Sequence, residues 1–235
     1  MKIKVVLPVP HDMWNKVILE SCKKAADKET QIEVVNTRKG AETLEGFYYA
    51  SFAEVEVIKE VIKAEKEGFN AVVVWCTGNV GVEASREVVN IPVVGIVEAA
   101  HLLAMLLGRR FSELVSVENV IVRHSRNADI IGAKSKLASV RAIGIPMKDF
   151  HKDLEFTFKK MLEAGKKAVE EDKADVIVLG CGAMLGITEK LSRELGIPVI
   201  EPGEVGIKMA EMLVKLNISH SKRAYPKPID GIKVI

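Results

Sequence analysis

Two cysteines occupy the same kind of position in the sequence. Residues 71–81 read AVVVWCTGNVG and residues 175–186 read DVIVLGCGAMLG, so Cys76 and Cys181 each end an apolar run and open a glycine-rich loop. A thiolate can take a proton from an acidic carbon while a thiol on the opposite face returns one, which inverts that carbon. Amide N–H groups of such loops, and of a following helix N-terminus, favour the thiolate. The pair predicts two-base proton transfer at a carbon next to a carbonyl.

An internal repeat surrounds the two cysteines. In each half a glycine stands five residues past the cysteine, and a short helical stretch then leads to an Ile-Pro pair. A glutamate stands six residues past each of these prolines, at Glu98 and Glu204. Matching halves predict two similar α/β lobes related by a rough twofold axis. Because parallel sheets bind ligands beyond the carboxyl ends of their strands, we expect Cys76 and Cys181 on opposite walls of one cleft.

The elements that must position these cysteines alternate between apolar runs and helical patterns. Runs such as KIKVVL, AVVVW and DVIVLG are separated by stretches with helical spacing, which is typical of parallel sheets covered on both faces. The helices expected from this spacing include residues 99–107, 154–171 and 205–216. The predicted fold is α/β, with two pseudo-symmetric lobes that each hold a parallel four-stranded sheet flanked by helices, and with the active site in the cleft between them. The repeat predicts a first lobe over residues 1–97 and a second over residues 98–204.

Composition narrows the class of protein. The chain has 235 residues, 48% of them hydrophobic and 28% charged, with a formal net charge of +2, so it lacks the basic excess of a nucleic-acid-binding protein. Its longest apolar stretch, IPVVGIVEAAHLLAMLLG, is interrupted by Glu98 and His101, and no signal peptide or membrane span is expected. The three widely spaced cysteines predict free thiols in a reducing cytoplasm. A single glutamine among many Lys and Glu residues suggests a protein from a hot environment.

Several residues have simpler interpretations beside the functional one. A cysteine at the end of a buried strand is most often a core residue, and Cys22, on the apolar face of the first helix, is assigned to the core. Glu98 and Glu204 at helix starts and His11 after the first strand either line the cleft or play no part in it. The loop at residues 38–49, RKGAETLEGFYY, either closes over a ligand or is an ordinary surface loop. The histidines show no metal-site spacing, so no metal is expected.

The chain resembles the aspartate/glutamate/hydantoin racemase superfamily, and its hydantoin racemase branch most. The stretches LLGRRFS, LASVRAIGIP, DVIVLGCGAMLG and LGIPVIEPGEVGIKMAEMLV carry the resemblance in the second half, and LEGFYYASFAE and IPVVGIVEAA in the first. It implies a cofactor-independent enzyme with Cys76 and Cys181 as the two acid/base residues. It also implies that residues 205–235 return to the first lobe. The positions implied to hold the substrate's oxygens are Thr77, Gly78, Asn79, Ser116, Gly182 and Ala183.

Two stretches that bear on the choice of substrate depart from the pattern of the hydantoin racemase branch. After the first strand the chain has LPVPHD where the hydantoin branch has Asn-Pro-Asn-Thr, and CTGN after the first cysteine is closer to the amino-acid racemases. The leading hypothesis is a racemase of 5-monosubstituted hydantoins that forms a homo-oligomer and has only a small molecule as its other partner. The alternatives are an aspartate/glutamate-type racemase and a non-catalytic protein that binds a small carboxylate. Relatives that decarboxylate malonates keep only the second cysteine, which counts against that activity.

Overall fold

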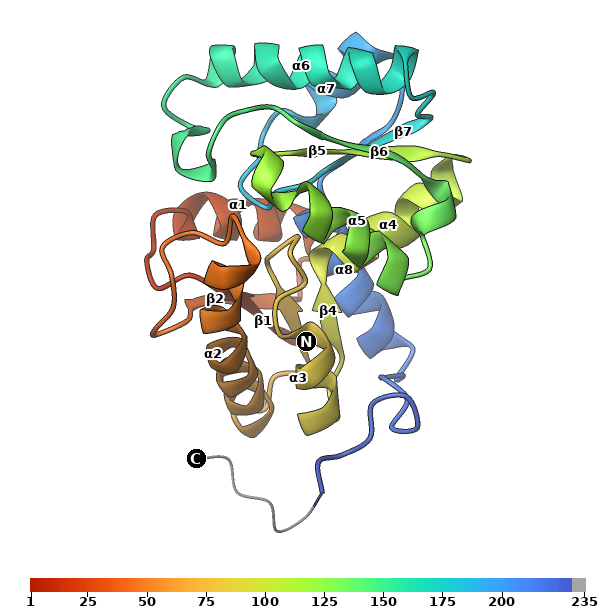
Figure 1. Ribbon diagram of the computed structural model, residues 1–235. Coiled ribbons are helices and arrows are strands. Elements are labelled where there is room, and N and C mark those ends of the chain that lie inside the picture. Colours follow the sequence, from red (N-terminus) through yellow and green to blue (C-terminus); the bar gives the residue numbers. More distant parts are fainter. Residues whose placement is uncertain (230–235) are drawn as a thin grey trace.

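The computed structural model describes residues 1–229, which form two stacked α/β lobes (Figure 1). The first lobe contains a four-stranded sheet of order β2-β1-β3-β4, formed by β1 (Lys2–Leu7), β2 (Gln31–Asn36), β3 (Ala71–Val74) and β4 (Val93–Gly95). All of its strand pairs are parallel. Every residue of β3 and all but the first of β1 are buried, because helices cover both faces of the sheet.

The second lobe repeats this arrangement. Its strands β5 (Phe111–Val115), β6 (Leu137–Ala142), β7 (Val176–Leu179) and β8 (Val199–Ile200) form a parallel sheet of order β6-β5-β7-β8. The equivalent strands of the two sheets therefore occur in the same spatial order. The predicted fold class, with two parallel four-stranded sheets flanked by helices, is confirmed.

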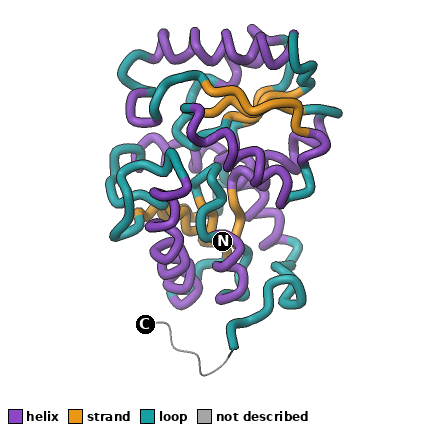
Figure 2. The backbone as a smooth tube through the Cα atoms, in the orientation of Figure 1, coloured by secondary structure: helices purple, strands orange, loops and turns teal. Residues whose placement is uncertain are grey.

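Helices surround both sheets (Figure 2). Those of the first half are α1 (Asn15–Ala25), α2 (Phe47–Lys66), α3 (Val82–Val88) and α4 (Ile96–Leu107). Those of the second half are α5 (Ile121–Ile130), α6 (Leu154–Glu170), α7 (Thr188–Leu195) and α8 (Pro202–Lys215), with short 3-10 turns at Glu118–Val120, Lys134–Lys136 and Met147–Asp149. None of the helices in residues 1–229 is long and apolar enough to cross a membrane.

The last helix and the segment after it lie against the first sheet. Helix α8 packs on α1, α4, β3 and β4. Beyond it, the Val93 N–H donates to His220 Nε2 at 2.9 Å, and Lys222 Nζ donates to the Arg86 carbonyl at 2.6 Å. These contacts hold the end of the described chain against the first sheet. The return of residues 205–235 to the first lobe stays a prediction, and the last six of these residues lie outside the described part. The lobe boundaries at residues 97/98 and 204/205 stay predictions.

Candidate active site

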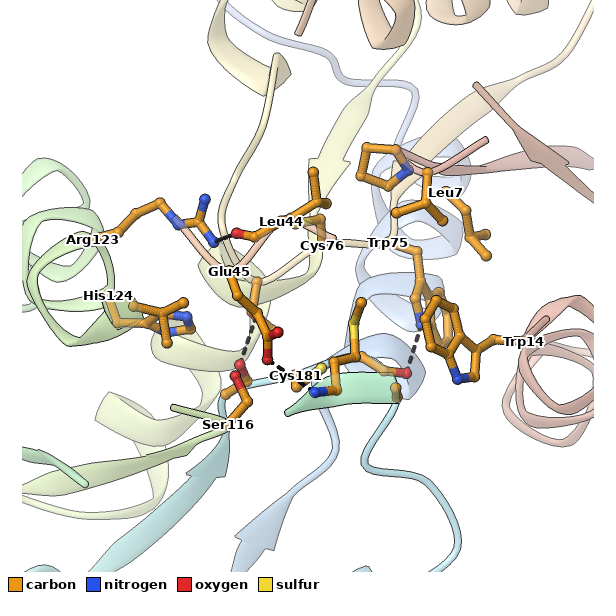
Figure 3. Close-up of a pocket in the computed structure, with 18 of the residues that line it drawn as sticks. Leu7, Trp14, Leu44, Glu45, Trp75, Cys76, Ser116, Arg123, His124 and Cys181 are labelled. Carbon is orange, nitrogen blue, oxygen red and sulfur yellow. Dashed lines mark hydrogen bonds between the residues drawn. The ribbon is translucent and has the colours of Figure 1, made fainter. Parts of the chain in front are cut away.

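A pocket lies between the two lobes, beyond the carboxyl ends of β1, β3, β5 and β7 (Figure 3). About 600 Å³ of empty space, which includes open solvent, lies between its wall residues. Most of its wall is apolar, and the large apolar side chains are Leu7, Val9, Trp14, Ile18, Leu44, Trp75, Val120 and Met147. Its polar side chains, apart from the cysteines, are Glu45, Thr77, Ser116, Arg123 and His124.

Cys76 and Cys181 line this pocket from equivalent loops (Figure 3). Each cysteine begins a tight turn: Asn79 N donates to the Cys76 carbonyl at 3.2 Å, and Met184 N donates to the Cys181 carbonyl at 3.1 Å. Both cysteines are free thiols. A side chain at Gly180, just before Cys181, would place its Cβ 2.5 Å from Val115 Cγ1, so only glycine lets the loop leave the strand there.

The two loops are braced against each other across the lobes. Trp75 Nε1 donates to the Gly182 carbonyl at 2.9 Å, and Thr77 Oγ1 donates to the Gly180 carbonyl at 2.8 Å. The indole fits because Gly182 has no side chain: a Cβ there would lie 2.6 Å from Trp75 Nε1. These contacts fix the second cysteine loop relative to the first, which is what a reaction that uses both loops requires.

Burial raises the pKa of both thiols. For Cys76 the loss of solvent dominates, and the Arg123 guanidinium and the amides of Gly78 and Val80 oppose it. For Cys181 burial raises the pKa to about 12, the Ala183 amide opposes it, and the negative charges of Cys76 and Glu45 add to it. The thiolate stabilisation expected from the loop amides is therefore present, but the loss of solvent outweighs it.

The structure brings six of the eight predicted site residues to the pocket wall: Cys76, Thr77, Ser116, Cys181, Gly182 and Ala183. Gly78 stands behind the wall and donates its N–H to Cys76 Sγ at 3.3 Å. Asn79 is in the left-handed region at φ 56°, and its side chain lies against Gly95, away from the pocket. The roles of Gly78 and Asn79 toward a substrate stay predictions.

The weaker candidates lie elsewhere. Glu98 forms an ion pair with Arg86, and neither Glu98 nor Glu204 lines the pocket. His11 Nε2 is 3.1 Å from the Glu42 carbonyl, and its ring packs edge-on against Trp14, outside the wall. Cys22 is fully buried in the core, as expected.

Sequence reasoning missed the polar residues that close the pocket. Arg123, at the start of α5, donates to the Leu44 carbonyl and, at 3.3 Å, to the Gly46 carbonyl. Glu45 Oε1 accepts the Met147 N–H at 2.9 Å. The loop expected at residues 38–49 ends at residue 46, directly before α2; it is tied to the second lobe and contributes Leu44 and Glu45 to the wall. The long polar loop was the only sequence signal that pointed to this closure.

A second missed feature is a charged residue inside a buried strand. Glu113 lies in β5 with no exposed surface, between the imidazoles of His101 and His124. The letters FSELVSV contain the signal, because a glutamate inside an apolar strand needs a buried partner. No group of three or more metal-ligating side chains is found among residues 1–229.

Solved structures and sequence relatives agree on the class of protein. The crystal structure of an allantoin racemase from Pseudomonas fluorescens superposes with a TM-score of 0.95 at 33% identity, covering all of both chains. A hydantoin racemase of Pseudomonas sp. (strain NS671) is 36% identical over 97% of this chain and 92% of its own length. One from Paenarthrobacter aurescens is 34% identical over 98% of each. Fold and relatives define the protein as an isomerase, a racemase.

The family model for Asp/Glu/Hydantoin racemase matches residues 15–210. The chain belongs to this family. The predicted resemblance, and the prediction of an enzyme of the racemase type, are confirmed.

Proposed function

We propose that the protein racemises 5-monosubstituted hydantoins, with Cys76 and Cys181 as the two acid/base groups. The observation that carries the proposal is the pair of free thiols, one from each lobe, that line a single pocket on equivalent loops. The names of the relatives support the substrate class, because hydantoin racemases and an allantoin racemase resemble the chain over nearly its whole length. Allantoin is itself a hydantoin, with a ureido group on C5.

The proton transfers balance without a cofactor. The thiolate of one cysteine takes the C5 proton, and the electron pair moves into the neighbouring carbonyl to give an enolate. The thiol of the other cysteine then protonates C5 from the opposite face. The enzyme ends the turnover with the two protonation states exchanged, so that the same pair can run the reaction in the other direction.

Neighbouring charges favour Cys76 as the thiolate of the resting enzyme. Besides burial, every group that shifts the pKa of Cys76 acts in favour of the thiolate, namely Arg123 and the amides of Gly78 and Val80. Cys181 has Glu45 near it, whose carboxylate disfavours a second negative charge. Cys181 would then wait as the thiol and act as the proton donor in the first turnover.

The pocket fits an uncharged cyclic ureide better than an amino-acid dicarboxylate. Its single guanidinium, on Arg123, is only 6% exposed and is bound to the Leu44 and Gly46 carbonyls, while a carboxylate, Glu45, lines the wall. Aspartate or glutamate would bring two carboxylates into the pocket. Among the described residues, no unpaired guanidinium or ammonium group lines the wall to bind them. The apolar side chains suit the C5 substituent of a hydantoin instead.

Proton exchange in deuterated buffer tests the proposal. An L-hydantoin with an apolar C5 substituent should lose its optical activity and gain deuterium at C5 at matching rates, and D- and L-aspartate and glutamate should be inert. Allantoin in the same panel shows whether the C5 group can be polar. Absence of both exchange and racemisation across the hydantoins would refute the substrate assignment, and turnover of aspartate or glutamate would favour the rival activity.

Cysteine variants test the mechanism. Cys76→Ser and Cys181→Ser should each lose at least about a thousandfold in racemisation, because an alcohol is a far weaker acid than a thiol at the same place. Each variant should retain at most exchange of the C5 proton at one face of the substrate. Cys22→Ala is the matched control, since this buried thiol lies in the core away from the pocket. A protein that only binds a small carboxylate would keep its ligand affinity in both serine variants.

We also propose that the protein acts in the cytoplasm as a homo-oligomer and comes from a hot environment. Exposed aromatic side chains gather at the start of α2, where Tyr48 is 71% and Phe52 is 56% exposed, and they support a subunit interface. Light scattering coupled to gel filtration gives the oligomeric state, and a monomer at micromolar concentration contradicts this part. A melting temperature in the ordinary mesophilic range would contradict the proposal that the protein comes from a hot environment.

A further inference from the structure

Two equivalent segments of the repeat flank the cysteine loops. In the first sheet β1 lies beside β3, which leads into the Cys76 loop, and in the second sheet β5 lies beside β7, which leads into the Cys181 loop. The segment after β1 and the segment after β5 therefore hold matching positions in the two lobes. Both contribute side chains to the pocket wall, so their chemistry can be compared directly.

The segment after β1 is apolar. Its wall residues, from the end of β1 to the middle of α1, are Leu7, Pro8, Val9, Trp14 and Ile18. The indole N–H of Trp14 is the only hydrogen-bonding group among these side chains. Trp75 lies on the same side of the pocket, and its N–H already donates to the Gly182 carbonyl (Figure 3). We call these six residues the apolar end.

The segment after β5 is polar instead. Apart from Val120, its wall residues are Ser116, Arg123 and His124, and Glu45 adds a carboxylate beside them. Ser116 is 4% exposed, and its hydroxyl has no hydrogen-bond partner within residues 1–229. This oxygen is not among the fully enclosed polar atoms, so it is open to the pocket. We call Glu45, Ser116, Arg123 and His124 the polar end.

The two cysteines lie between these ends. Figure 3 shows Arg123, His124 and Ser116 on one side of the labelled cysteines. It shows Leu7, Trp14 and Trp75 on the other side. Matching segments of two similar lobes thus give the pocket opposite chemistry on either side of the thiols. Such a pocket favours one orientation of a ligand that is itself polar at one end and apolar at the other.

A 5-substituted hydantoin is divided in this way at its reacting carbon. The other four ring atoms are the two N–H groups and the two carbonyl carbons, and the substituent extends from C5 away from them. When C5 lies at the thiols, the ring and the substituent point to different parts of the wall. The polar end offers the ring a hydroxyl and a carboxylate as hydrogen-bonding partners, and the apolar end offers the substituent aromatic and aliphatic contacts.

We propose that the substrate binds with its ring at the polar end and its C5 substituent at the apolar end, and that Trp14 and Ile18 are specificity-determining residues that select apolar substituents. The inference rests on the proposed function and specifies its substrate class. A ureido group at the apolar end would give up its hydrogen bonds to water and find few partners. The enzyme should therefore prefer benzyl or isobutyl substituents to the ureido group of allantoin, although the chain is similar to an allantoin racemase.

One variant at each end tests the orientation. The kcat/KM of racemisation is measured for 5-benzylhydantoin and 5-methylhydantoin with wild type, Trp14→Ala and Ser116→Ala. Trp14→Ala should lower the value for the benzyl compound at least about tenfold more than for the methyl compound, because only the larger substituent reaches the indole. Ser116→Ala should lower both values by the same factor, about threefold or more, because the two compounds share the ring.

The opposite pattern overturns the proposal. A Trp14→Ala loss that is equal for the two compounds means that the substituent lies elsewhere. A Ser116→Ala loss that is absent, or that differs more than about threefold between the compounds, means that the ring does not lie at the polar end. Each comparison is made within one variant, so it is independent of the amount of folded enzyme, and Trp14→Leu replaces Trp14→Ala if that variant does not fold.

Two buried residues of α1 separate direct contact from loosening of the helix. Ile18 is 2% exposed and lines the pocket, whereas Cys22, one turn further on, is fully buried and does not. Ile18→Ala should lower the benzyl-to-methyl ratio of kcat/KM about threefold or more, and Cys22→Ala should leave it unchanged. An equal change in both variants means a general effect of α1 and overturns the assignment of Ile18.

Allantoin tests the selection of apolar substituents. Each kcat/KM is divided by the rate of uncatalysed racemisation of the same compound in buffer, which corrects for the different acidity of C5. On this scale wild type should favour 5-benzylhydantoin over allantoin at least about tenfold, and Trp14→Ala should reduce that preference. An equal or larger value for allantoin overturns the selection of apolar substituents.

Failure of this inference is distinguishable from failure of the proposed function. If wild type racemises the hydantoins without the expected pattern, only the orientation and the roles of Trp14 and Ile18 are wrong. If no hydantoin is racemised, the proposed substrate is wrong, and the inference that rests on it falls as well.

Discussion

Replacing Glu201 by glutamine should make the protein's stability less dependent on pH. Glu201 is the N-cap of α8, where its carboxylate accepts the N–H groups of Gly203 and Glu204, and it is only 5% exposed. The helix cap matters to the pocket because the Trp75 indole packs over Gly203, where a Cβ would lie 2.1 Å from the ring. Burial raises the pKa of Glu201 from 4.5 to about 7, although the two amides oppose it.

The sign and size of this pH dependence of the unfolding free energy follow from the difference in the pKa of Glu201 between the folded and unfolded states. An acid whose pKa is higher in the folded state stabilises the fold when protonated, so this contribution is complete below pH 4.5 and is lost as the pH rises through about 7. A shift from 4.5 to about 7 corresponds to about 3 kcal/mol over the whole titration, of which about 2 to 3 kcal/mol falls between pH 5 and pH 8.5. Glutamine keeps an acceptor for the helix N-terminus but does not ionise.

Urea unfolding at pH 5 and pH 8.5 measures this difference. The free energy of unfolding of the wild type, minus that of Glu201→Gln, should fall by about 2 to 3 kcal/mol between the two pH values. Subtraction removes the contributions of the other titrating groups. Glu204→Gln removes the same charge from the same helical turn at a more exposed position and controls for the charge alone. A difference that stays constant or rises with pH would refute the reasoning about burial.

Four other perturbations have defined outcomes. Gly182→Ala pushes a Cβ to 2.6 Å from Trp75 Nε1, so it should cost about 1–3 kcal/mol in urea unfolding and slow racemisation, and unchanged values contradict the packing argument. Glu45→Gln removes a carboxylate that raises the pKa of Cys181, so alkylation of Cys181 by iodoacetamide at fixed pH should be roughly threefold to tenfold faster. Arg123→Met frees the loop before α2, residues 38–46, and removes the cation that favours both thiolates, so KM should rise and kcat should fall; unchanged KM and kcat would contradict the role of Arg123 in holding this loop. Because burial raises the pKa of both thiols, racemisation of wild type should increase about tenfold per pH unit from pH 6 to pH 8, and a flat profile contradicts a thiolate base.

Sequence patterns were sufficient for the secondary structure and poorer for its ends. The long helix expected at residues 154–171 is α6 (Leu154–Glu170), but the helix expected to begin at residue 99 begins at Ile96, and the one expected at residue 205 begins at Pro202. A helix interior has a periodic apolar face, whereas its start depends on capping contacts. At α8 the cap is Glu201, whose role depends on its burial against the rest of the fold.

The sequence by itself determined the repeat, the two parallel lobes and the positions of both cysteines. Burial on both faces of a parallel sheet leaves continuous apolar runs, and a loop after such a run lies at the ligand-binding edge. The local sequence therefore predicts the positions of Cys76 and Cys181. Family resemblance added the enzyme class and the other residues expected around the pair.

Only the tertiary structure decided what else meets at the pocket. Thr77 and Gly78 were expected to face the substrate, yet their donors bind Gly180 and Cys76, and the free polar positions belong to Ser116 and His124. Such choices depend on which carbonyls, thiols and carboxylates distant segments leave within hydrogen-bonding distance. Spacing along the chain encodes which faces are buried. It does not encode the partner that a polar side chain finds once the two lobes have closed on each other.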